Sequence, residues 1–187
     1  MPGSEAHYKT FARSNHTITD EQPLVSKAFR YIDGLDGDVL VSYSGSDFDM
    51  EFLAARSTQF DSAPSPPTLH TAGQHIDLFT DQKAAYDPGK KWPPLEECLS
   101  SYGFPVPKTT WNGAPLDNSR FGDEFGPAFL EVVATGGDHA IAAYREVLDH
   151  YLTTDLEANL ALYYADQGVA FDPVMLEVPG AFTTAQS

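Results

Sequence analysis

One stretch, residues 143–165 (AYREVLDHYLTTDLEANLALYYA), has the apolar spacing of a single long helix. With an advance of about 100° per residue, one side of this helix carries five apolar residues, Tyr144, Val147, Leu148, Tyr151 and Leu162. We expect this stripe to face the protein core. Asp155 falls in the same stripe, where an unpaired carboxylate is costly, and no Lys or Arg lies one turn away. A bound metal ion would meet that charge; the alternative is a helix that rolls to bring Asp155 to the surface.

The charge balance is the unusual feature of the composition. The chain has 27 acidic against 11 basic residues, a formal net charge of −16. Such a charge repels nucleic acid at low salt and strains a compact fold unless it is screened. We interpret it as adaptation to a salt-rich cytoplasm, of the kind that halophilic archaea have. The alternative is an ordinary acidic protein with an acid-tolerant partner.

Length and pattern limit the organisation of the chain. Its 187 residues suit one domain, which we assign to residues 1–172, followed by a C-terminal tail at 173–187. Nothing approaches the run of about 18 apolar residues that crosses a membrane, so no membrane contact is expected. The start has no basic segment followed by an apolar one, so no signal peptide is predicted. With the single Cys98, this favours a cytoplasmic location.

The order of predicted elements indicates the fold class. Strands are predicted at 8–13, 38–43 and 75–79, and helices at 20–34, 47–56, 95–104, 126–133 and 143–165. Residues 105–125 are rich in Gly, Pro and Asn and are expected to be mostly loop. Strands that alternate with helices predict an α/β domain with a partly parallel sheet.

Two acidic residues stand where a cation could bind. In YSGSDFDMEFL a strand ends, a small-residue turn follows and a helix begins with Asp49 in its first turn. Ligands bind at such strand ends in α/β sheets, although an Asp in a first turn also complements the helix dipole. Asp47 fits that second role as an N-cap, which leaves Asp49 for a cation.

The second acidic position is Asp155, one helical turn beyond Tyr151. The shared face lets the phenol hydrogen-bond a metal-bound water. Two-metal hydrolysis of phosphodiesters needs several converging carboxylates, and we expect Asp49 and Asp155 to converge as two of them. Lys90 and Lys91, the one adjacent basic pair, are candidates to touch a phosphate backbone; a solvated pair is the alternative.

These motifs carry a resemblance. VLVSYSGSDFDMEFLAAR is similar to the second motif of the proofreading-type 3′–5′ exonucleases, Tyr-Asn-x-x-x-Phe-Asp, and YLTTD resembles their third, Tyr-x-x-x-Asp. HIDLF lies between them, where the family has a strand. The likeness runs from about Asp20 to Ala165. Ser44 stands where the family has Asn, and His150 also fits a His-x-x-x-x-Asp form of the third motif. The first motif, Asp-x-Glu, has no match before Asp20.

The resemblance implies an RNase H-like α/β fold, a mixed sheet flanked by helices, here N-terminally incomplete. It implies a 3′–5′ exonuclease in which Asp49 and Asp155 bind Mg²⁺ or Mn²⁺ and Tyr151 orients the attacking water. Ser44 would contact the nucleic acid, with DNA favoured over RNA. Without the first motif we expect little or no hydrolysis by the chain as given, and a partner chain is one way to complete the sheet. The alternative is a non-catalytic nucleic-acid-binding or remnant RNase H-like domain.

Overall fold

Helices predominate in the computed structural model, which describes residues 7–13, 21–85, 89 and 93–184. The described strands form one two-stranded and one three-stranded sheet, so the predicted α/β class is confirmed. The chain divides into two compact units, Thr17–Cys98 and Met1–His16 with Leu99–Ser187. Within the described ranges, no helix combines the length and the apolar character needed to cross a bilayer.

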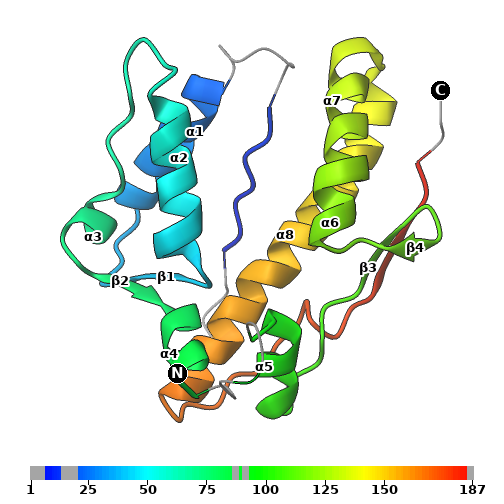
Figure 1. Ribbon diagram of the computed structural model, residues 1–187. Coiled ribbons are helices and arrows are strands. Elements are labelled where there is room, and N and C mark those ends of the chain that lie inside the picture. The colour runs from blue at the N-terminus through cyan, green and yellow to red at the C-terminus, as the bar shows by residue number, and fades with distance from the viewer. Residues whose placement is uncertain (1–6, 14–20, 86–88, 90–92, 185–187) are drawn as a thin grey trace. The chain divides into compact units, whose positions relative to one another are not determined.

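The unit Thr17–Cys98 contains a pair of parallel strands, β1 and β2 (Figure 1). β1 is Leu40–Ser42 and β2 is His75–Asp77, with Leu40 opposite His75. The helices of this part of the chain are α1 Glu21–Asp33, a π-helical turn Gly45–Asp49, α2 Met50–Ser57, α3 Thr68–Thr71, α4 Leu78–Ala85 and α5 Leu95–Ser101. The last of these continues past Cys98 into the other unit.

The helices of this unit begin and pack as their sequences suggest. Val25 and Phe29 lie one turn apart on α1 and are both buried, the spacing of an amphipathic helix. Glu21 in the first turn of α1 accepts a hydrogen bond from the guanidinium of Arg56, in the last turn of α2, and forms an ion pair with it. Both charges also suit their helix ends, because the macrodipole favours acids at N-termini and bases at C-termini. This ion pair therefore ties α1 to α2.

Both strands predicted for this unit form, each shorter than expected. The strand predicted at 38–43 is confirmed over Leu40–Ser42. The strand predicted at 75–79 ends at Asp77, because Oδ1 of Asp77 accepts the Phe79 N–H at 3.1 Å, the bond of an N-cap, and α4 begins at Leu78. Asp47, expected as the N-cap of the preceding helix, lies inside the π-helical turn.

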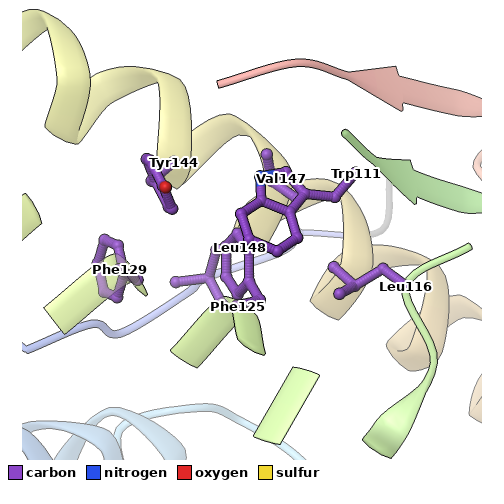
Figure 2. Close-up of a cluster of buried hydrophobic side chains, with 7 residues drawn as sticks. All are labelled: Trp111, Leu116, Phe125, Phe129, Tyr144, Val147 and Leu148. Carbon is purple, nitrogen blue, oxygen red and sulfur yellow. The ribbon is translucent and has the colours of Figure 1, made fainter. Parts of the chain in front are cut away.

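The other unit is built around α8, Asp138–Asp166, the long helix predicted at 143–165. It packs on α7, Gly126–Thr135, and on the strand β3, Thr109–Trp111. Figure 2 shows the core between them, which is rich in aromatic rings in edge and stacked contacts; its buried members are Trp111, Leu116, Phe125, Phe129, Tyr144, Val147 and Leu148. The apolar stripe predicted for the helix thus faces the core over Tyr144, Val147 and Leu148.

The prediction of loop for residues 105–125 is wrong over much of its length. β3 turns at Asn112 and Gly113, with φ of 50° and 81°, into β4, Ala114–Pro115. Asn-Gly is the preferred pair for a two-residue hairpin turn with positive φ at both positions. A short helix α6, Asn118–Arg120, and a π-helical turn, Phe121–Phe125, follow, and the Asp117 side chain caps α6 at the Arg120 N–H, 2.8 Å away.

The two ends of this unit also differ from the sequence expectations. The segment assigned as a tail carries β5, Gly180–Phe182, which pairs in parallel with β3 (Figure 1). Residues 8–13, predicted as a strand, form none. Tyr8 and Thr10 instead donate side-chain hydrogen bonds to Glu157 and Asp149 of α8. The alternation that suggests a strand therefore serves to place two hydroxyls against a helix.

Candidate functional site

The turn that follows β1, residues 44–46, is held by a carboxylate. Ser44 lies in the left-handed region with φ of 64°. The N–H groups of Ser44 and Ser46 donate to Oδ1 and Oδ2 of Asp77, at 2.7 and 2.8 Å. Successive backbone N–H groups in such a turn form an anion-binding concavity. Here the chain fills that concavity with its own Asp77 from the end of β2, which fixes the turn to the neighbouring strand.

Asp49 lies one helical turn beyond this concavity. Its Oδ2 would stand 3.5 Å from a Cβ placed on Gly45, so the carboxylate reaches back over the turn. Partial burial of the group, and next the charge of Asp77, raise the pKa of Asp49 above its ordinary value. An acid in this position gains from a proton or a cation. The Ser44 expected to contact substrate lies in the same turn and is half-buried.

The aromatic residue that opens the second motif has a structural role. The Tyr43 hydroxyl donates to the carbonyl of Pro93, and its ring meets the edge of Phe79 with 5.5 Å between centroids. These contacts anchor the end of β1 to α4 and to the segment before α5. Of the two motif residues, Tyr43 therefore fixes the strand end, and Asp49 is the one that supplies a carboxylate.

Tyr151 and Asp155 lie on one face of α8, as the spacing predicts. The Tyr151 hydroxyl donates to Oδ1 of Asn118 at 2.6 Å, and its ring stacks on Phe121 with centroids 4.8 Å apart. Asp155 is half-buried. Asp49 belongs to one unit and Asp155 to the other, and their convergence stays a prediction. Lys90 and Lys91 lie outside the described residues.

The carboxylate that α8 does bury is Glu157, which sequence reasoning passed over. Glu157 is 3 % exposed. Its Oε1 accepts the Val174 N–H at 3.0 Å, and its Oε2 accepts the Leu176 N–H at 2.7 Å. Desolvation, and next the charge and hydrogen bond of Glu157, raise the pKa of Tyr8 to about 12. Glu157 is therefore a structural acceptor that holds the C-terminal segment on α8.

Sequence reasoning also missed a chain of polar side chains between β1 and β2. Ser42 Oγ lies 2.8 Å from His75 Nε2, and His75 Nδ1 lies 2.8 Å from His70 Nδ1. Ser46 Oγ is 3.3 Å from the same His75 Nδ1. The one signal in the sequence is that Ser42 and His75 each fall within a predicted strand, at 38–43 and 75–79. Their pairing depends on strand register, which the sequence does not reveal.

The described residues do not by themselves assemble a complete donor set for a cation. Among them no group of three or more His, Cys, Asp or Glu side chains is arranged to hold a metal ion. Asp77, the acid whose charge acts on Asp49, has both oxygens engaged by backbone N–H groups. A Mg²⁺ or Mn²⁺ ion at Asp49 would need further oxygen ligands from elsewhere. Searches against protein-family models, curated proteins and solved structures give no match.

Proposed function

We propose that this chain is an RNase H-like nuclease domain of the proofreading 3′–5′ exonuclease type. The observation that carries the proposal is the surroundings of Asp49. Asp49 follows the carboxyl end of β1, beside a parallel strand that ends in Asp77. Ligands of α/β sheets bind at such strand ends. The raised pKa of Asp49 also marks it as a functional-site candidate, because perturbed carboxyls gather at such sites.

In this proposal the substrate is the 3′ end of a nucleic acid, with DNA favoured over RNA. Asp49 and Asp155 would hold Mg²⁺ or Mn²⁺, which would supply the charge stabilisation that phosphodiester hydrolysis requires. Tyr151 would orient water beside Asp155, after giving up its bond to Asn118. Ser44, Lys90 and Lys91 would contact the strand being degraded. A partner chain or further segment would extend the two-stranded sheet of β1 and β2.

A second candidate function is a non-catalytic nucleic-acid-binding domain of the same fold. The observation that favours it is the incomplete set of metal ligands among the described residues. In the described part of the chain, three-ligand groups of His, Cys, Asp or Glu are absent. A domain of this kind would keep the β1 turn and α8 and would bind a strand without cleaving it. Phosphate contacts alone can supply such binding, with a strong dependence on salt.

The two functions are separated by one set of assays in molar KCl. The purified chain is incubated with 3′-labelled and 5′-labelled DNA and RNA oligonucleotides, with Mn²⁺ or with EDTA. Stepwise shortening from the 3′ end that is lost in Asp49→Asn and in Asp155→Asn supports the exonuclease. The matched controls are Asp47→Asn in the same turn and Glu146→Gln on the exposed side of α8, which we expect to behave as the unaltered chain does.

Binding is measured in parallel by fluorescence anisotropy of a labelled single strand. Retention of the strand without shortening, in every metal tested, supports the second function. Shortening that survives both Asp49→Asn and Asp155→Asn overturns the assignment of these residues. A chain that neither binds nor shortens any strand between about 0.5 and 3 M KCl, where salt screens long-range repulsion, contradicts both functions.

A further inference from the structure

The polar chain Ser42–His75–His70 has the connectivity of a nucleophile, a base and a group that orients the base. A hydroxyl within hydrogen-bond reach of an imidazole, with the second ring nitrogen held by another group, is the arrangement that activates serine. Here the two contacts are 2.8 Å each, from Ser42 Oγ to His75 Nε2 and from His75 Nδ1 to His70 Nδ1. The residues come from β1, β2 and the end of α3, all within the unit Thr17–Cys98.

Counting donors supports the polarity that this chemistry needs. The Gly45 N–H donates to Ser42 Oγ at 3.1 Å, which leaves the serine hydrogen for His75 Nε2. His75 then carries its proton on Nδ1 and donates it to Nδ1 of His70. Both ring nitrogens of His75 then have a role compatible with a neutral imidazole, which supplies one donor and one acceptor. The hydrogen bonds from Ser42 to His75 and from His75 to His70 therefore need no charged histidine.

The surroundings keep the base neutral and the serine reachable. Desolvation, and next the charge of His70, lower the pKa of His75, while Asp77 opposes them. Ser42, His70 and His75 are each half-buried, so these three side chains are neither sealed in the core nor fully solvated. A Cβ at Gly45 would lie 2.4 Å from Ser42 Oγ. The lack of a side chain at position 45 therefore lets the Gly45 backbone approach the hydroxyl closely enough to donate its N–H.

We propose that Ser42 is a nucleophile toward small carboxylic esters, with His75 as its general base and His70 as a positioning residue. Ser42 Oγ attacks the ester carbonyl carbon as its proton passes to His75 Nε2. The C–O bond to the alcohol breaks, and His75 returns the proton to the leaving oxygen. Water then attacks the acyl carbon and gives a proton to the same nitrogen. The bond from that carbon to Oγ breaks, His75 returns the proton to Oγ, and the acid leaves, so that one ester and one water yield one acid and one alcohol.

Few backbone N–H groups near Ser42 are available to stabilise an oxyanion, and this limits the expected rate of ester hydrolysis. The Gly45 N–H lies beside Oγ, whereas those of Ser44 and Ser46 are held by Asp77. A missing oxyanion donor lowers turnover by about 10²–10³-fold. Covalent capture is therefore the sharper probe. A fluorophosphonate forms a phosphorus–oxygen bond to Oγ as fluoride leaves, with the proton taken by the base, and it needs no second step.

The experiment treats the whole chain with an alkyl fluorophosphonate in molar KCl, between about pH 5 and 9, across the ordinary titration range of histidine. Peptide mass spectrometry locates the adduct, and release of p-nitrophenol from its acetate reports turnover. We expect the adduct on Ser42, lost in Ser42→Ala and slowed at least tenfold in His75→Gln. Ser65→Ala, an exposed serine of the same unit, is the matched control and should label as the wild type does.

The role of His70 is tested by the pH profile. Asn places its Oδ1 near the position of a histidine Nδ1 and accepts a hydrogen bond there. His70→Asn should therefore keep the labelling rate and its pH dependence, whereas His70→Ala should slow labelling and displace the profile. A far-UV circular dichroism spectrum confirms that each variant is folded. No adduct on Ser42 of the wild type at any of these pH values, or the same labelling rate in His75→Gln, overturns the proposal.

Discussion

The buried carboxylate Glu157 offers the most direct test of how this protein is held together. Substitution by Ala removes the acceptor of two backbone N–H groups, those of Val174 and Leu176, and of the Tyr8 hydroxyl. In the native protein bulk water does not reach these groups, since Glu157 is 3 % exposed. We expect the C-terminal segment that carries β5 to detach from α8 more readily.

The magnitude follows from the bonds lost. A buried donor left without an acceptor costs about 1–3 kcal/mol, so the two N–H groups together predict a loss of roughly 2–6 kcal/mol for Glu157→Ala. Glu157→Gln keeps one acceptor oxygen and turns an NH₂ toward the other N–H, so it should lose about half as much. Against a total stability of about 5–15 kcal/mol, either loss is readily measured.

The assay is denaturant unfolding in molar KCl, followed by the fluorescence of Trp111 in a Trp92→Phe background. Trp111 belongs to the core of the same unit as Glu157, so it reports the unit that is perturbed. Hydrogen exchange of the Val174 and Leu176 amides provides a local measure. A loss below about 0.5 kcal/mol, the range of ordinary surface substitutions, together with unchanged exchange of these amides, would refute the reasoning.

The same contact makes a prediction at alkaline pH. The pKa of Tyr8 is raised to about 12, above its unfolded value, so the neutral phenol is favoured by folding. This contribution to stability is fully present below about pH 10, the ordinary tyrosine value, and is lost as pH rises through 12. In Glu157→Gln the carboxylate charge is gone, so the pKa of Tyr8 should fall. Ultraviolet titration of the tyrosines in both proteins measures the change.

Three further perturbations have definite expected outcomes. Asp49→Asn should raise the free energy of unfolding at pH 7 by a few tenths of a kcal/mol, the size of an exposed charge pair, because the raised pKa of Asp49 means that its ionised form opposes folding. A lower melting temperature for Asp49→Asn than for the control Asp47→Asn would count against this. Gly45→Ala should destabilise the fold by about 1–3 kcal/mol through overpacking, since its Cβ would lie 2.4 Å from Ser42 Oγ; equal thermal melts would show that the turn relaxes freely. Molar KCl should raise the melting temperature above that in dilute buffer because it screens the net charge of −16, and an unchanged or lower value would favour an ordinary acidic protein.

What the sequence determined by itself was the periodic part of the structure. The 3.6-residue spacing of Tyr144, Val147 and Leu148 predicted a long helix and its buried face, and both are confirmed in α8. The position of β1 followed from a short β-branched run between turn residues. These features are local, because side chains a few residues apart decide them whatever the rest of the chain does.

The Asn112-Gly113 hairpin was also within reach of the sequence and was passed over. Asn-Gly between short apolar runs is a strong hairpin signal, and the pair does turn β3 into β4. The richness of residues 105–125 in Gly, Pro and Asn outweighed it and led to a prediction of loop. The lesson is that composition over 20 residues says less than the chemistry of one dipeptide.

Only the tertiary structure decided which polar groups meet. Glu157, and not Asp155, is the acid that α8 buries, because two N–H groups from residues 174–176 arrive there to satisfy it. The contact of Ser42 with His75 depends on the parallel register of β1 and β2 across more than 30 residues. Hydrogen bonds between groups so far apart in the chain depend on how separate elements pack, and no local pattern encodes that packing.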